Sequence, residues 1–238
     1  VGETAAGLFA AVRHPRKVRW RETFYYMDMC GSDALPIVVV ICYLMGLIIG
    51  FQSAVQMHRF GADIYVVDLV GLSIVEELGP LMLAMIATGR AGSAFAAEIG
   101  TIKVSEEIDA MTTMGLSSNR FLVVPKILAM MVAMPLLTLF GSIMGILGGL
   151  TVGTLQLDLP LVTYLNRTLN ALQPIHFCEG LTKSVVFAVL IAAVGCMRGF
   201  DASRDAQGVG RSTTSAVVSG IFLIIVSDSI LTMLFSTV

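Results

Sequence analysis

Residues 63–88 read DIYVVDLVGLSIVEELGPLMLAMIAT, and this stretch decides the fold class. A helix of roughly 20 apolar residues crosses the hydrocarbon core of a bilayer, and this stretch is long enough. Its apolar run from Ile64 to Thr88 is interrupted by VEELGP, which places Glu76 and Glu77 shortly before Pro80. A charged group facing lipid at the bilayer centre costs about 2.5–3.5 kcal/mol. The stretch therefore predicts a membrane-crossing helix whose two carboxylates face something other than lipid.

The composition of the whole chain agrees with a membrane protein. Hydrophobic residues make up 56% of the 238 residues and charged residues 13%, and the mean hydropathy is +0.85. Charged residues are about 25% of an ordinary soluble domain. A net charge of -2 gives no support for a nucleic-acid partner. We expect an all-α polytopic protein with five crossings, at residues 34–57, 63–88, 121–154, 181–197 and 216–235.

The basic residues predict the orientation of these crossings, because Lys and Arg accumulate on the cytoplasmic side. With the N-terminus inside, the C-terminus at Val238 faces outward. Only three of the 15 basic residues then lie outside: Arg59, Arg167 and Lys183. A sixth crossing over residues 80–101 is the alternative, but it would carry Arg90 and Glu98 through hydrocarbon.

The chain divides into an N-terminal segment, residues 1–33, and a membrane-spanning domain at 34–238. Residues 5–27 mix aromatic and basic side chains, which suits a helix lying in the membrane interface or an ordinary juxtamembrane anchor. The chain begins at Val1 without methionine, so we expect further sequence upstream. The four cysteines lie far apart and are interpreted as packing residues: Cys30, Cys42, Cys178 and Cys196.

Small residues recur every four positions in two of the expected helices. Such faces let helix backbones approach closely in a bilayer, within one chain, at a dimer seam or along a sliding surface. The sequence leaves these uses open. The two ladders are Gly141, Gly145, Gly149 and Gly153, and Gly89, Ser93 and Ala97.

The polar segment between the second and third crossings predicts a short amphipathic helix over residues 104–115. Ser105 is placed to cap it, acidic residues follow in its first turn, and Gly115 is expected to end it. The helix is either a plain surface helix or a contact for a cytoplasmic partner, since methionines suit an adaptable interface. The contact would use Glu106, Glu107, Ile108, Met111, Met114 and Gly115.

Motifs for catalysis, nucleotide binding and metal binding are absent from the sequence. There is no GxxxxGK[ST], HExxH or GxSxG run, and His14, His58 and His176 are scattered without ligand spacing. We expect no cofactor, no metal and no enzymatic activity, so energy must come from another chain or from a gradient. An ion-coupled secondary carrier using membrane carboxylates is the alternative function, and a structural scaffold is a third.

Residues 76–115, EELGPLMLAMIATGRAGSAFAAEIGTIKVSEEIDAMTTMG, together with TKSVVFAV and GVGRSTTSAVV further on, resemble the MlaE-type permeases of bacterial lipid ABC transporters. The resemblance covers roughly residues 34–238. It implies a multi-pass homodimeric permease in the bacterial inner membrane, bound by ATP-binding subunits. It further implies an MCE-domain periplasmic partner, a small STAS-domain subunit and phospholipid transport between the inner and outer membranes.

The resemblance also implies a substrate site at VEELGP. Glu77 matches the family pattern and is expected near the lipid headgroup, whereas Glu76 stands where a basic residue is common. Pro80 cannot donate a hydrogen bond to the carbonyl of Glu76, so we expect the helix to bend or break there. The break would open a hydrated pocket completed by the end of the first crossing, with Gln52, Gln56 and Met57. The structural alternative is a kink whose carboxylates pair with neighbouring residues.

Overall fold

The computed structural model describes residues 19–115 and 118–237, and within these residues it contains helices and no strand. Residues 1–18, which hold much of the expected interfacial segment, and Val238 lie outside the described part. The prediction of an all-α protein with five crossings is confirmed. Five helices are long and apolar enough to span a membrane: Trp20–His58, Tyr65–Val104, Phe121–Leu155, Pro174–Phe200 and Ala206–Ser236.

The first of these consists of α2 (Trp20–Cys30), the short turn η2 (Ser32–Ala34) and α3 (Leu35–His58). α2 packs on α8 with Thr23, Tyr26 and Cys30 buried. Trp20 and Phe24 are exposed on its other side, as expected for aromatic residues at a membrane interface. α2 therefore leads into the first crossing without a break in the chain's helical course.

The second long helix runs without interruption from Tyr65 to Val104. It comprises α4 (Tyr65–Leu72), η3 (Ser73–Leu78), α5 (Gly79–Ala87), η4 (Thr88–Gly92) and α6 (Ser93–Val104). At 1.5 Å per residue its 40 residues span about 60 Å, twice the thickness of the hydrocarbon core. Arg90 and Glu98 thus lie on an extension of the second crossing, and no separate sixth crossing is needed.

The sequence predicts a bend or a break at Pro80, and of these the break is wrong, because the helix is continuous from Tyr65 to Val104. η3 and η4 are π-helical turns, and the Gly79 N–H donates to the carbonyl of Ile74, five residues back. A Cβ at Gly79 would lie 2.5 Å from that carbonyl oxygen, so glycine is needed there. Pro80 then falls at the start of α5, directly after this wide turn. The wide turn accommodates the proline and keeps the helix continuous.

The expected amphipathic helix is α7 (Glu107–Thr113), shorter than predicted. The prediction that Ser105 caps it is wrong, because α6 continues to Val104 and the Ser105 hydroxyl donates to the carbonyl of Thr101. Glu106 stands at the start of α7 with a left-handed backbone (φ 59°), and Gly115 follows its end with φ +74°. The end at Gly115 agrees with the prediction.

The third long helix is η5 (Asn119–Val123) followed by α8 (Val124–Leu155), and its glycine face serves packing within the chain. A Cβ at Gly46 of α3 would lie 1.8 Å from the Gly145 carbonyl oxygen, and one at Gly153 would lie 2.8 Å from the Tyr164 ring. α3 and α8 therefore touch backbone to backbone. In the second ladder, Gly89 faces open space.

Three helices complete the fold: α9 (Leu161–Ala171), α10 (Pro174–Phe200) and α11 (Ala206–Ser236). The sequence analysis did not predict α9. The Arg167 Nε of α9 donates to Asp68 of α4 at 2.8 Å, and this hydrogen bond raises the pKa of the guanidinium. Burial among α4, α8 and α9 raises the pKa of the Tyr164 hydroxyl to about 12.

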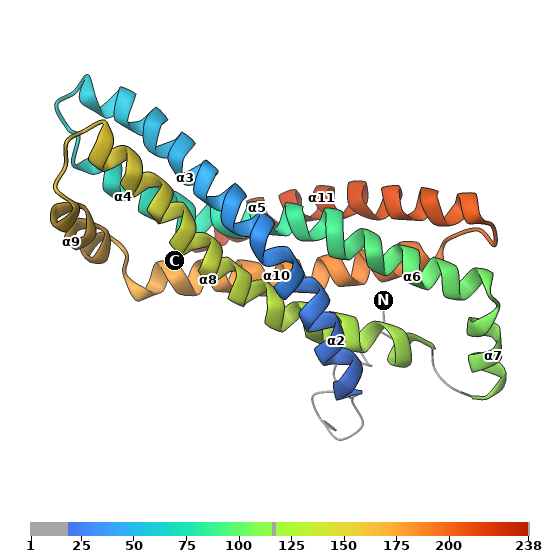
Figure 1. Cartoon of the computed structure of the whole chain (residues 1–238). Helices are drawn as coiled ribbons and strands as arrows, with labels where there is room; N and C mark the ends of the chain where they lie inside the picture. The colour runs from blue at the N-terminus through green and yellow to red at the C-terminus, as the bar shows by residue number, and fades with distance from the viewer. Residues whose placement is uncertain (1–18, 116–117, 238) are drawn as a thin grey trace.

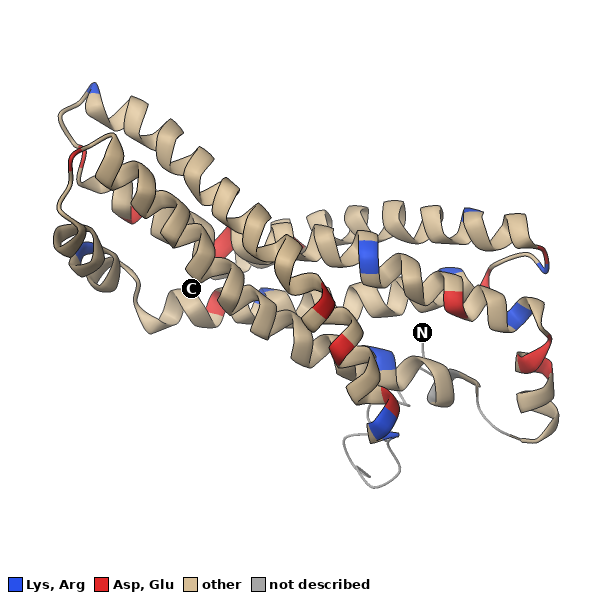
Figure 2. Ribbon diagram, in the orientation of Figure 1, with Lys and Arg blue, Asp and Glu red and all other residues tan. Residues whose placement is uncertain are grey.

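The basic residues are unevenly distributed between the two ends of the molecule. Figure 1 shows α7 and the α10–α11 connection at one end, with α9 and the α3–α4 connection at the other. Figure 2 shows most of the described Lys and Arg residues in the part of the molecule that holds α2, α6, α7 and the α10–α11 connection. Three cysteines are buried as expected, but Cys178 is exposed.

Candidate functional site

The carboxylate of Glu77 leads to a cluster of charged and polar side chains inside the helix bundle. Lys183 of α10 is 2% exposed, and its Nζ forms an ion pair with Glu77 Oε2. The same Nζ lies 3.4 Å from Asp228 Oδ1 and donates to Thr232 Oγ1 at 2.9 Å, both on α11. Thr232 donates in turn to Glu77 Oε1 at 2.6 Å. Helices of the second, fourth and fifth crossings thus meet at one buried cation.

This cluster carries one formal positive charge and two formal negative charges. An isolated ion at this depth would be very unfavourable, and the pairing with hydrogen bonds removes most of that penalty. The Glu77 side chain is still 34% exposed and Thr232 is exposed, whereas Lys183 is enclosed. The cluster therefore has an open side on the α11 surface through which a polar ligand can reach it.

Glu76 makes a separate contact. The His176 Nδ1, near the start of α10, lies against Glu76 Oε1. Both side chains are partly exposed, and the contact is an ion pair when the imidazole is protonated. Glu76 and Glu77 thus each face a basic partner on α10, as the pairing alternative for VEELGP requires.

The other residues expected at the substrate site lie elsewhere on the chain. Gln52 and Gln56 are exposed near the end of α3, and Met57 packs against the small apolar cluster at the α3–α4 end. The buried face of α3 packs on α8, while Glu77 contacts α10 and α11. A single chain does not bring these three residues into one described pocket with Glu77, and their role in substrate binding stays a prediction.

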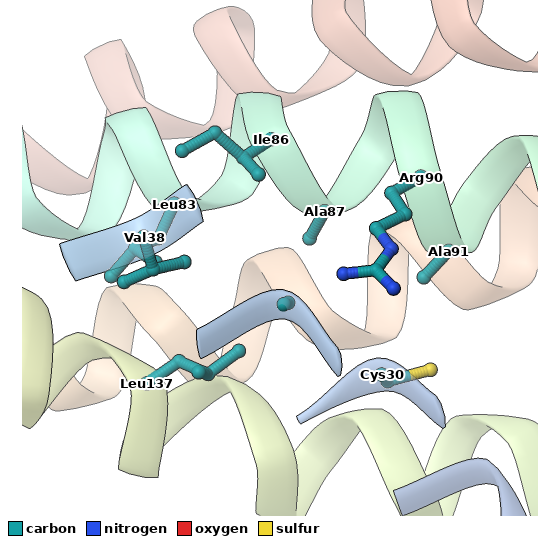
Figure 3. Close-up of a pocket in the computed structure, with 9 residues that line it drawn as sticks. Cys30, Val38, Leu83, Ile86, Ala87, Arg90, Ala91 and Leu137 are labelled. Carbon is teal, nitrogen blue, oxygen red and sulfur yellow. The ribbon is translucent and has the colours of Figure 1, made fainter. Parts of the chain in front are cut away.

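A narrow pocket lies between the α2–α3 junction, α5 and α8. Its lining is apolar except for Arg90, whose side chain points toward it in Figure 3. Its volume of about 10 Å³ is far too small for an acyl chain. Arg90 is held at the mouth by the carbonyl and carboxylate of Asp33. The pocket is therefore a packing defect beside an ion pair and not a lipid cavity.

A second site of interest is the surface formed by α7 and the α10–α11 connection. Arg204 Nη2 donates to Asp109 at 2.9 Å and its Nη1 lies 3.8 Å from Glu106. Lys103 donates to the carbonyl of Phe200 at 2.6 Å. Ile108 of α7 packs against the core, whereas Met114, just after α7, is two-thirds exposed. α7 is thus braced by a loop nearly 100 residues away and presents its other side to the surroundings.

The sequence analysis missed Lys183 and Asp228. It counted Lys183 on the outer side, at the very start of a fourth crossing expected from residue 181, whereas α10 begins earlier, at Pro174. A signal was available, since each residue is a charge within an otherwise apolar crossing, and such charges mark functional sites. His, Cys, Asp and Glu residues in the described part of the chain form no group of three or more that could hold a metal ion.

Comparisons with known proteins bear on this arrangement. Residues 23–234 match the family described as Permease MlaE. A probable ABC transporter permease protein of Rickettsia bellii is 40% identical over 205 residues, which cover 86% of this chain and 79% of that protein. A probable ABC transporter permease protein of Synechocystis is 34% identical over 218 residues, which cover 92% and 83%. Protein TRIGALACTOSYLDIACYLGLYCEROL 1, chloroplastic, of Arabidopsis thaliana is 29% identical over 219 residues, which cover 92% and 63%. The chain therefore belongs to the Permease MlaE family.

Proposed function

We propose that this ABC transporter permease moves phospholipid between the inner and outer membranes, and that the Glu77–Lys183–Asp228 cluster contacts the lipid headgroup. The observation that carries the proposal is the buried cation of Lys183, held between two carboxylates inside helices long and apolar enough to span a membrane, with one side open. Ionisable groups in this position usually belong to a substrate or ion pathway.

The chemistry of the cluster suits a headgroup that carries both signs of charge. A phosphate can take hydrogen bonds from the Lys183 ammonium, as charge-assisted bonds to phosphate are strong. Glu77 and Asp228 would repel the same phosphate, but they can accept hydrogen bonds from a headgroup ammonium. The Arabidopsis relative is named after trigalactosyldiacylglycerol, a glycerolipid, which also favours a lipid substrate.

The permease depends on a partner for energy, since the sequence has no phosphate-binding loop for a nucleotide. We place the ATP-binding subunit against α7, with Glu106, Glu107, Ile108, Met111, Met114 and Gly115 at or near the contact. The resemblance to the lipid permeases supports an MCE-domain protein on the periplasmic side, a STAS-domain subunit and a position in the bacterial inner membrane. These partners and this location are part of the proposal.

We also infer a homodimer. A single chain does not enclose the open side of the cluster, and α11 exposes large apolar residues along its length, including Phe222, Ile230 and Met233. A second copy related by a two-fold axis would bury this surface and place two clusters beside a shared cavity. Native mass spectrometry of the complex gives the copy number directly.

The headgroup proposal is tested in the complete complex with Glu77→Gln and Glu77→Lys. The readouts are photocrosslinking to phospholipid, ATPase rate and outer-membrane barrier integrity. Both variants should lower crosslinking and barrier integrity, and Glu77→Lys should have the larger effect because it places two cations together. The matched control is Asp158→Asn, which changes an exposed carboxylate at the opposite end from α7. Unchanged values for Glu77→Lys would mean that VEELGP has no part in lipid transport.

An ion-coupled carrier is the second candidate, and the paired acid and base in the bundle are the observation that favours it. The two functions separate in proteoliposomes. Lipid movement that needs ATP and its subunit, and that continues without an ion gradient, supports the ABC transporter. Movement that follows a proton or sodium gradient without ATP supports the carrier.

A further inference from the structure

A second buried charge, Lys126 at the start of α8, lies outside the site described above. Its side chain is 0% exposed, and its Nζ donates to the Tyr26 hydroxyl at 2.9 Å, Glu98 Oε1 at 3.1 Å and the Leu122 carbonyl at 3.4 Å. The Tyr26 hydroxyl donates to the same Glu98 oxygen at 2.5 Å. All three donors of the ammonium therefore have acceptors.

Aromatic rings close this cluster on its apolar side. The Lys126 Nζ lies 4.4 Å from the centre of the Tyr26 ring and 5.8 Å from that of Phe95. The two rings meet edge to face at 5.8 Å. A cation at this distance from ring faces is attracted to them, which adds to the ion pair. The Glu98 side chain is 37% exposed, so the cluster is buried at its cation and open at its carboxylate.

The three residues join helices whose main packing partners differ, although α8 and α6 both also pack on α10. α2 packs on α8, whereas α6 packs on α10 and α11, as Figure 1 shows. Tyr26 comes from α2, Lys126 from α8 and Glu98 from α6. Glu98 lies six residues before the end of α6, and α7 follows directly. The cluster thus ties α2 and α8 to the helix that carries α7.

Stability alone gives a weak reason for such a cluster, because a buried ion pair can often be replaced by apolar residues without loss of stability. What the pair provides is a fixed register between helices, which is the best-attested use of buried charges. α2 continues through η2 into α3, so a displacement of α2 is carried into the first crossing.

We propose that Tyr26, Glu98 and Lys126 form a joint that makes α2 and α3 follow the movement of α6 and α7 during transport. The inference rests on the proposed function, in which an ATP-binding subunit acts on α7. These are positioning residues, since they lie apart from the Glu77 cluster. The joint transfers displacement between two groups of helices, and it takes no part in lipid binding.

The experiment uses the complete complex in proteoliposomes and compares the wild type with Glu98→Gln/Lys126→Met. The double variant removes both charges and keeps the side-chain sizes, so it should still fold. Its ATPase activity should remain, while the lipid moved per ATP hydrolysed falls by about tenfold, within the range of typical coupling energies. Tyr26→Phe should lower the same ratio by a smaller factor. The matched control, Asp68→Asn/Arg167→Met, removes an interhelical ion pair between α4 and α9 and should leave the ratio unchanged.

A second readout measures the joint itself. Spin labels at Phe24→Cys and Thr101→Cys, both exposed, report the α2–α6 distance in a Cys178→Ser background whose other cysteines are buried. The distribution of this distance should be narrow with and without ATP in the wild type, and it should be broader in the double variant. A purely structural role would lower ATPase activity and transport in proportion, and an unchanged ratio in the folded double variant overturns the joint. If the wild type moves no lipid with ATP, the proposed function fails. The label distances then still decide, since equal widths in both proteins overturn the joint.

Discussion

Gly79 shows how a single residue without a side chain sets the course of the second crossing. Its N–H reaches back five residues to Ile74, and its Cα lies where a Cβ would press against that carbonyl. Pro80 follows, and it has no backbone N–H to donate. The pair Gly79–Pro80 is therefore the local cause of the wide turn that holds Glu76 and Glu77.

We expect Gly79→Ala to destabilise the protein by about 1–3 kcal/mol, the usual cost of overpacking. The control is Gly89→Ala in the same long helix, where a Cβ would meet nothing within 4 Å. That variant should be neutral or gain up to about 1 kcal/mol from helix propensity. Unfolding in mixed detergent micelles measures both changes, and equal stability of the two variants would contradict the role of Gly79.

Among the elements, α7 depends on a partner segment that is distant in sequence. Its own seven residues are too few for a stable isolated helix. Arg204 supplies two contacts from the α10–α11 connection and Ile108 supplies an apolar one. The orientation of α7 is thus set by the fourth and fifth crossings as well as by α6.

Changes of charge on α7, or on Arg204 that contacts it, should separate ATP hydrolysis from transport. Met111→Asp and Glu107→Lys alter the surface offered to the ATP-binding subunit, and Arg204→Glu repels Glu106 and Asp109. Each should weaken binding of that subunit by roughly 1–2 kcal/mol or more, as for a contact residue near the centre of an interface. Pull-down and ATPase assays measure the effect. Arg59→Glu, an exposed reversal at the opposite end, is the control; normal binding by all three variants would reduce α7 to a plain surface helix.

The elements were largely predictable because their signals are local. Length and polarity located all five crossings, and Gly115 marked the end of α7. The limits of the helices were less predictable, since α2, α6 and the start of α10 continue beyond the apolar runs. Ser105 was misassigned because a serine can end one helix as easily as begin another. α9 was missed because its apolar residues alternate with Asn, Thr and Arg and resemble a loop.

The molecule as a whole has an end with α7 and an end with α9. The orientation of these ends in the membrane can be measured by cysteine labelling. Cys178 is the exposed natural cysteine and lies near the start of α10. A membrane-impermeant maleimide should label it in intact spheroplasts. Thr112→Cys on α7, in a Cys178→Ser background, should react only after permeabilisation. The reverse pattern would invert the predicted topology.

Only half of the candidate site could be predicted, because its members lie far apart in the sequence. Glu77 could be found from its neighbours in the sequence, but Lys183 and Thr232 lie 106 and 155 residues away from it. Pairing across such separations depends on how the crossings pack, and a local pattern does not contain it. The same holds for Glu98 and Lys126, whose helices meet only in the folded chain.

The wide turn at η3 also has a consequence for sequence length. Buried positions along the second long helix come in adjacent pairs, four residues apart at 66 and 67, 70 and 71, and 74 and 75, and again at 79 and 80, and 83 and 84. The step from the pair at 74 and 75 to the pair at 79 and 80 is five residues and falls at η3. This turn therefore contains one residue more than a regular α-helical spacing of the buried face requires. Removing Leu78 would restore the step of four, but it would also place Pro80 inside an ordinary α-helical turn, where its ring clashes with the carbonyl four residues back. A deletion elsewhere in the helix would turn everything beyond it by about 100°. The carboxylates of VEELGP therefore lie on what amounts to a one-residue insertion, and the proline that follows it opposes the closure of this insertion into an ordinary turn.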